Sequence, residues 1–190
     1  MKDGFIRVAA ATPDIHVADP QYNSEQIIEL MEQGSTRGVK VMAFPELCLT
    51  AYTCSDLFLQ ESLLREAKKE LKRILQASKS KDMILFVGMP WMHKGKLYNV
   101  AAVLNRGRIL GIVPKKHLPN YSEFYELRHF NPGMEKVEMT DWEGVQVPMG
   151  MNLLFACRTM PELVLAAELC EDVWVPCPPS ISHALAGATV

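Results

Sequence analysis

Apolar residues along the chain form short continuous runs separated by a long helical stripe. The runs at residues 6–11, 39–44 and 83–89 have the length and hydrophobicity of strands that are covered on both faces. The predicted helix between the first two runs carries apolar residues at helical spacing, namely Ile27, Ile28, Leu30 and Met31. We expect this helix to end at Gly34 or Gly38. A strand, a helix and a second strand in this order predict a layered α/β architecture.

A second amphipathic helix is predicted at residues 57–76, where leucines alternate with many charges. We interpret its lysines and glutamates as a solvent-facing surface rather than a binding patch. Further on, the apolar runs 100–104 and 108–113 bracket Asn-Arg-Gly at 105–107. This pattern predicts a β-hairpin with a tight turn.

The last third of the chain predicts more strands and one short helix. We expect a strand pair at residues 145–148 and 151–157, followed by a buried strand at 163–169. Residues 182–190 are typical of a helix that leads into a new strand, and the sequence stops where that strand begins. We therefore predict one domain over residues 1–190 that is incomplete at its C-terminal end.

Composition and charge narrow the class of protein. The chain has 190 residues, of which 48% are apolar and 22% charged, enough for a sizeable core in one domain. A formal net charge of -2 argues against binding to nucleic acids or anionic membranes, because long-range attraction would be missing. We see neither a bilayer-spanning apolar run nor an N-terminal signal pattern, and so we expect a cytoplasmic protein.

The sequence contains five cysteines, Cys48, Cys54, Cys157, Cys170 and Cys177. Their odd number and their spacing favour reduced thiols over disulfides or a zinc site. Cys170 is the candidate of interest, because it ends the apolar run 163–169 and is followed by two carboxylates. α/β enzymes often carry reactive residues where a buried strand ends. The alternative is a structural thiol, the more common state of a cysteine in an apolar run.

Three segments, taken together, resemble one family. They are Phe-Pro-Glu-Leu at 44–47, Val-Pro-Lys-Lys-His-Leu-Pro at 113–119 and Glu-Leu-Cys-Glu-Asp-Val-Trp at 168–174. In this order they resemble the carbon–nitrogen hydrolase, or nitrilase, superfamily, and most closely the N-terminal glutaminase domains of glutamine-dependent NAD synthetases. The resemblance covers the chain from about residue 5 to its end. It implies a nitrilase-type α-β-β-α four-layer sandwich, apparently truncated at the C-terminus.

The resemblance also implies roles for individual residues. Cys170 would be the nucleophile, Glu46 the general base and acid, and Lys115 the cation beside the developing oxyanion. Lys116 is adjacent, but Lys115 directly follows Val-Pro as in the family pattern. Glu126 would brace the lysine.

We also expect roles for three more residues near these positions. Tyr121 stands where the synthetase-type domains place an aromatic contact to glutamine. We expect Glu171 and Asp172 to form a turn whose amide points at the oxyanion and whose carboxylates bond to the backbone, with Glu171 supporting the site. The alternative for Tyr121, as for Glu126, is an ordinary loop residue, and the alternative for Glu171 and Asp172 is a metal or acid role.

The function that the resemblance implies is hydrolysis of the glutamine amide through a cysteine thioester, with no metal or cofactor. Ammonia would pass to an ATP-dependent synthetase domain, which uses ATP and Mg²⁺ to amidate nicotinic acid adenine dinucleotide. That domain is the expected partner, but its Ser-Gly-Gly-x-Asp-Ser loop does not occur in this sequence. We also expect a homo-oligomer. The alternatives are a nitrilase-superfamily amidase of different specificity, or an inert folded fragment with weak glutaminase activity or none.

Overall fold

A computed structural model describes residues 4–190. The first three residues of the N-terminal segment, where we saw no signal pattern, lie outside the described residues. Its centre is a seven-stranded mixed sheet in the order β1-β2-β3-β4-β5-β7-β6. The strands are β1 (Arg7–Ala10), β2 (Val39–Ala43), β3 (Ile84–His93), β4 (Lys96–Asn105), β5 (Arg108–Pro114), β6 (Glu138–Trp142) and β7 (Val145–Met149). β1, β2 and β3 run parallel, β3 to β5 form antiparallel hairpins, and β7 lies parallel to β5 and antiparallel to β6.

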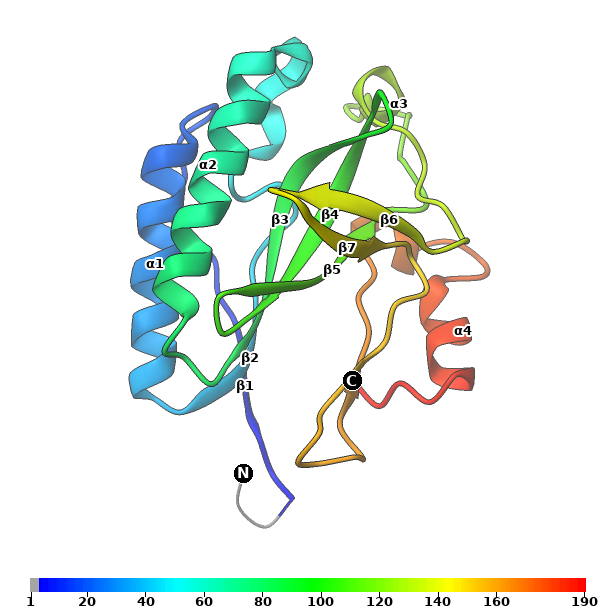
Figure 1. Cartoon of the computed structure of the whole chain (residues 1–190). Coiled ribbons are helices and arrows are strands. Elements are labelled where there is room, and N and C mark those ends of the chain that lie inside the picture. The colour runs from blue at the N-terminus through cyan, green and yellow to red at the C-terminus, as the bar shows by residue number, and fades with distance from the viewer. Residues whose placement is uncertain (1–3) are drawn as a thin grey trace.

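Two helices, α1 (Pro20–Thr36) and α2 (Glu61–Ser78), lie side by side over one face of this sheet (Figure 1). α1 ends just before Gly38, which has a φ of +74° and so takes a left-handed conformation that favours glycine. The predicted second helix starts later than expected. Residues Tyr52–Leu59 form a 3₁₀ segment with an internal kink, and extended Gln60 separates that segment from α2.

Hairpin turns of two residues connect the long antiparallel strands. The predicted turn at Arg106 and Gly107 is confirmed, with φ values of +46° and +77°. Lys94 and Gly95 form a second such turn, with φ values of +48° and +73°. This second turn extends β3 and β4 beyond the predicted runs, because the polar residues near it still pair across the hairpin.

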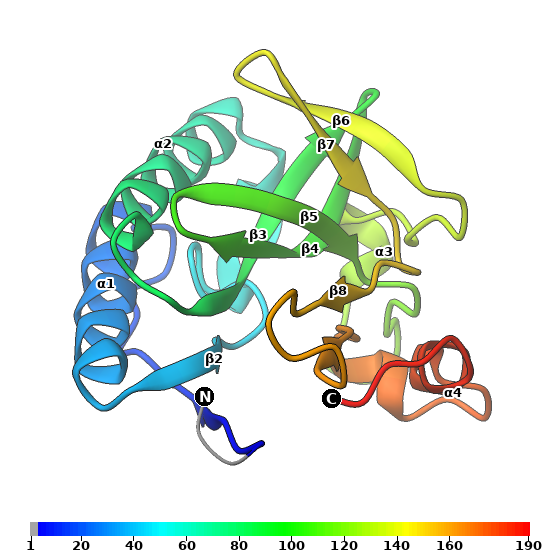
Figure 2. The same ribbon diagram turned by 60° about the horizontal axis from the view of Figure 1, so that its bottom comes forward.

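The two faces of the sheet bury different sets of residues. On β3, Leu85 and Val87 pack toward the helices in the main core, whereas Ile84 and Phe86 point to the opposite face. That opposite face is covered by a small sheet of two strands, β8 (Phe155–Ala156) and β9 (Val164–Leu165), and α4 (Pro179–Leu185) lies nearby (Figure 2).

The predicted strand at 163–169 is regular only at β9, and the rest of it is extended but irregular. A strand needs a neighbour that accepts and donates along its length, and β8 supplies one for two residues only. The predicted pairing of 145–148 with 151–157 is wrong, because β7 pairs with β5 and β6 while β8 pairs with β9.

After α4 the chain returns to β9. The N–H groups of Thr189 and Val190 donate to the carbonyl of Val164, and the carbonyl of Val190 accepts from Ala166. The order of layers is therefore helices, large sheet and small sheet, which agrees with the predicted α/β class. Within residues 4–190, no helix has both the length and the hydrophobicity that crossing a membrane requires.

Candidate active site

Glu46 is positioned by a close approach between two backbone segments. It lies three residues after β2, and the segment around it packs directly over Gly88 of β3. The N–H of Leu49 donates to the Gly88 carbonyl at 3.1 Å. A Cβ at Gly88 would come within 2.4 Å of the Pro45 oxygen and the Leu47 nitrogen, so only glycine allows this approach.

Lys115 directly follows β5, and its side chain is completely buried. Its ammonium donates to Glu46 Oε1 at 2.6 Å and to Glu126 Oε1 at 2.7 Å. We call Glu46, Lys115 and Glu126 the charge cluster. Glu126 begins the short helix α3 (Glu126–His129) and is also buried, whereas 15% of the Glu46 side chain is exposed.

The charges of the cluster change one another's protonation. Burial opposes the charge of Lys115, but the carboxylates of Glu46 and Glu126 outweigh it and raise the pKa of the lysine. Burial raises the pKa of Glu126, and the negative charge of Glu46 adds to this effect, while Lys115 opposes it. The lysine therefore stays an ammonium ion, and two carboxylates share it.

Two residues that we did not single out from the sequence complete the surroundings of the charge cluster. The hydroxyl of Tyr52 donates to Glu126 Oε1 at 2.8 Å. Asn99 of β4 donates through its side-chain amide to Glu46 Oε1. The signal for Asn99 was available, since it is the one amide side chain in the interior of an otherwise apolar run, Leu97 to Leu104.

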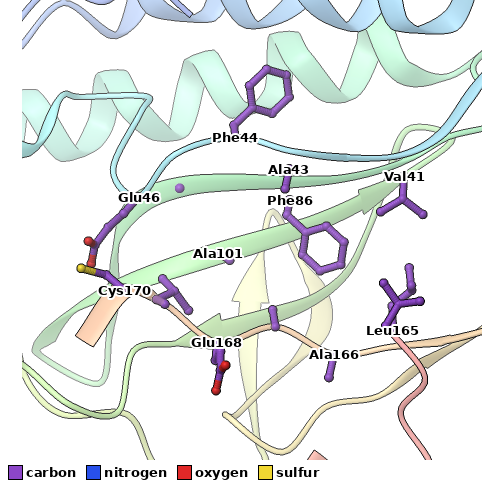
Figure 3. Close-up of a pocket in the computed structure, with 14 residues that line it drawn as sticks. Val41, Ala43, Phe44, Glu46, Phe86, Ala101, Leu165, Ala166, Glu168 and Cys170 are labelled. Carbon is purple, nitrogen blue, oxygen red and sulfur yellow. The ribbon is translucent and has the colours of Figure 1, made fainter. Parts of the chain in front are cut away.

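Cys170 opens a 3₁₀ turn, Cys170–Val173, and has a φ of +47°, unusual for a residue with a side chain. Its sulfur and the carboxylate of Glu46 point toward each other (Figure 3). Burial raises the pKa of the thiol, and the charge of Glu46 raises it further, whereas Lys115 lowers it. The thiol is therefore kept protonated next to a carboxylate that can accept its proton.

The turn that carries Cys170 is held by Asp172, whose side chain is buried. Asp172 Oδ1 accepts from the N–H of His117 at 2.7 Å. Its Oδ2 accepts from the N–H groups of Leu169 at 3.1 Å and Lys116 at 3.3 Å. One carboxylate thus ties the cysteine turn to the segment that follows Lys115, in agreement with the predicted bonding to backbone.

The other predicted residues lie around the rim of the site. Glu171 does not bond to backbone as expected, because its Oε2 accepts from the Tyr121 hydroxyl at 2.9 Å. The Tyr121 side chain lies on an exposed loop and packs edge-on against Phe124. Lys116 points away and pairs with Glu135 at 3.2 Å, so Lys115 alone of the two lysines joins the charge cluster.

A cavity of about 520 Å³ opens beside these groups. Glu46 and Cys170 stand at one end, and the walls are mostly apolar, formed by Val41, Phe86 and Ala101 of the large sheet and by residues 165–169 (Figure 3). Across residues 4–190, no three His, Cys, Asp or Glu side chains gather as a metal site would require. The cavity thus offers a thiol and a carboxylate to a bound molecule, and the buried ammonium of Lys115 is bonded to that carboxylate.

The family model described as Carbon-nitrogen hydrolase matches residues 7–190. The chain belongs to the carbon–nitrogen hydrolase family. This confirms the resemblance seen in the three sequence segments. The charge cluster and the cysteine turn lie within the matched residues.

Curated relatives of this carbon–nitrogen hydrolase chain are named glutamine-dependent NAD(+) synthetases. The protein from Mycobacterium tuberculosis is 41% identical over 187 residues, which are 98% of this chain and 28% of the relative. The one from Aquifex aeolicus is 33% identical, covering 97% of this chain and 29% of the relative. The chain thus spans less than a third of the length of these proteins.

Solved structures of two other proteins have a fold similar to that of this chain. The glutamine-dependent NAD(+) synthetase from Cytophaga hutchinsonii has a TM-score of 0.85 at 26% identity, covering 97% of this chain and 29% of that one. An amidase from Nesterenkonia sp. has a TM-score of 0.59 at 21% identity, covering 75% of this chain and 54% of that one. The second likeness concerns the fold alone, and together they support the predicted nitrilase-type α/β class.

Proposed function

We propose that this chain is a glutaminase domain, which hydrolyses the side-chain amide of glutamine through a thioester on Cys170. The observation that carries the proposal is that the Cys170 thiol and the Glu46 carboxylate face each other at one end of the cavity, with the ammonium of Lys115 bonded to that carboxylate. A thiol beside a base and a cation is the arrangement that nucleophilic attack on an amide requires.

In the first half of the reaction, the Cys170 sulfur attacks the carboxamide carbon while Glu46 takes the thiol proton. The charge that develops on the oxygen is stabilised by the ammonium of Lys115 and by the backbone N–H of Glu171. Glu46 then gives its proton to the nitrogen as the carbon–nitrogen bond breaks. Ammonia leaves, and a thioester remains.

In the second half, a water molecule attacks the thioester carbon and gives a proton to Glu46. The carbon–sulfur bond breaks, glutamate is released, and the proton returns to the sulfur. Glu126 keeps Lys115 charged and in place throughout, because it provides the second carboxylate partner of the ammonium.

Glutamine is the proposed substrate because the similar proteins are named glutamine-dependent NAD(+) synthetases. The exposed pair of Tyr121 and Glu171 at the rim offers a hydroxyl and a carboxylate to the amino-acid end of this substrate. Residues 1–190 would then supply ammonia to a synthetase domain that uses ATP and Mg²⁺. Self-association and a cytoplasmic location belong to the same proposal.

The test is covalent labelling with a diazoketone that mimics glutamine, read by intact mass and peptide mapping. We expect one adduct, on Cys170, which excess glutamine slows. Glu46→Gln and Cys170→Ser should both abolish it. Cys177→Ser is the matched control, because Cys177 is also exposed but does not line the cavity, and labelling should be unchanged.

Ammonia release separates the alternatives. Hydrolysis of aliphatic or carbamoyl amides in preference to glutamine would indicate an amidase of different specificity. If saturating diazoketone leaves Cys170 unmodified in a folded protein, the proposed substrate is wrong. An adduct without measurable turnover would identify a site that binds glutamine but does not complete the reaction.

A further inference from the structure

Asn99 is almost fully buried in β4 and contacts every member of the charge cluster. Its amide nitrogen donates to Glu46 Oε1 and, at 3.5 Å, to Glu126 Oε2. Its backbone carbonyl accepts from the N–H of Lys115 at 2.9 Å. One residue in a long, regular strand therefore links the two carboxylates and the lysine.

The hydrogen bonds to Glu46 are unevenly divided between its two oxygens. Lys115 Nζ and Asn99 Nδ2 both donate to Oε1. Both of these donors lie on Oε1 and neither contacts Oε2, while the carboxylate faces the sulfur of Cys170 (Figure 3). Two donors on one oxygen leave the other oxygen free for a proton.

The orientation of the Asn99 amide is fixed by the charges around it. Its NH₂ group lies toward two carboxylates, whereas its Oδ1 is buried without a partner in the part of the chain described. The reversed amide would place Oδ1 against both carboxylates and lose both hydrogen bonds. The Asn99 oxygen therefore stays without a hydrogen bond, while the NH₂ group donates to the charge cluster.

We propose that Asn99 is a positioning residue: by sharing Oε1 of Glu46 with Lys115, it leaves Oε2 as the base that takes the proton of Cys170. The inference rests on the proposed function, since it concerns the same proton transfer. It also explains how the buried Glu126 and the partly exposed Glu46 tolerate each other beside a single ammonium, because the amide hydrogens compensate part of their charge.

The test compares Asn99→Leu with Asn105→Leu, and neither variant adds charge. Asn105 lies at the end of the same strand, far from the site, and its amide donates to the backbone carbonyl of Met83. Two probes are used on each protein. Diazoketone inactivation gives a maximal rate and an apparent affinity, and iodoacetamide gives the rate of Cys170 alkylation as a function of pH, read by peptide mass.

For Asn99→Leu we expect the maximal inactivation rate to fall about 10- to 100-fold, the equivalent of one hydrogen bond to a charged group, with little change in affinity. The inactivation rate should fall across the whole pH range, because Glu46 Oε2 is no longer held toward the sulfur. The alkylation midpoint should also rise, because the uncompensated Glu46 charge acts more strongly on the sulfur. Asn105→Leu should leave both pH profiles unchanged.

Unchanged pH profiles in Asn99→Leu, or slower labelling that merely parallels a lower melting temperature, would overturn the proposal. If Asn99→Leu does not fold, Asn99→Ala is measured instead and carries the same expectations. If the unmodified chain resists the diazoketone, the proposed glutamine substrate fails, while the shift in alkylation midpoint between Asn99 and Asn105 variants still decides the role of Asn99.

Discussion

The charge cluster stands at the end of a seven-stranded sheet, whereas Cys170 belongs to a segment whose strands, β8 and β9, are two residues long. Glu46 follows β2 and Lys115 follows β5, and both strands are paired on both sides. Gly88 packs against the segment that carries Glu46. Cys170 depends instead on a 3₁₀ turn that Asp172 ties to the Lys115 segment.

This difference shows that the two parts of the site are held in place by different means. The buried charges need a rigid, water-poor frame, because an unpaired buried charge is strongly unfavourable. The proposed nucleophile, Cys170, needs an exposed atom at a defined place, and a strained turn with three backbone hydrogen bonds to one carboxylate provides it. Substitutions in the two regions should therefore fail in different ways.

The largest effect is expected for Lys115→Met, which removes the counter-charge shared by two carboxylates. The free energy of unfolding should fall by about 3–5 kcal/mol, and diazoketone labelling should be lost. Lys116→Met is the control, because Lys116 is partly exposed and pairs only with Glu135, so its effect should stay within about 0.5 kcal/mol. Urea denaturation measures both, and equal losses would contradict the assignment of Lys115.

A smaller loss is expected for Gly88→Ala, which pushes a methyl group into the backbone beside Glu46. Because backbone cannot move aside cheaply, we expect about 3 kcal/mol of destabilisation and slower labelling of Cys170. Gly34 lies inside α1, and the methyl group of Gly34→Ala would meet the flexible end of the Met42 side chain. Alanine is also the better helix former at this position. Thermal unfolding measures both variants, and we expect Gly34→Ala to unfold near the wild-type temperature. A Gly88→Ala variant as stable as the wild type would contradict the close backbone approach beside Glu46.

Asp172→Asn tests the turn that carries Cys170. The amide replaces one acceptor oxygen with a donor that faces backbone N–H groups, so we expect a loss of about 2 kcal/mol. Hydrogen exchange should rise at residues 169–174 and remain unchanged in β3 to β5, since the large sheet does not depend on this turn. Glu171→Gln is the control, as its amide oxygen can still accept from Tyr121. Uniformly faster exchange would show that the two regions are not separable.

Regular pairing and turn chemistry explain which parts of the fold were predictable. Arg106-Gly107 specifies its own turn, and the stripe from Ile27 to Met31 specifies one helix face. The strand at 163–169 was overpredicted, because its apolar composition satisfies the pattern while its regularity depends on a neighbour that local sequence does not reveal. The break at Gln60 was missed for a similar reason, since leucine spacing continues across it.

In the site, the reactive residue types were predictable, but the contacts between them were not. Glu46 is far from Lys115 and Glu126 in sequence. Their predicted grouping came from family motifs, and in the structure Lys115 lies within hydrogen-bond distance of both carboxylates. Neither Asn99 nor Tyr52 was given a role from the sequence, and only the folded chain shows whose charges they satisfy. Their roles follow from burial next to carboxylates.

The smallest expected effect links the two regions directly. The charge of Glu46 contributes to the raised pKa of Cys170, second only to burial, whereas Lys115 opposes it. Glu46→Gln removes that charge and keeps the shape, so the pKa of the thiol should fall and the midpoint of alkylation by iodoacetamide should move to lower pH. Peptide-resolved alkylation of Cys170 measures this, with exposed Cys177 as the internal reference in the same digest. A midpoint that stays in place or rises would mean that the carboxylate does not act on the sulfur, and the cysteine turn would then be independent of the charge cluster.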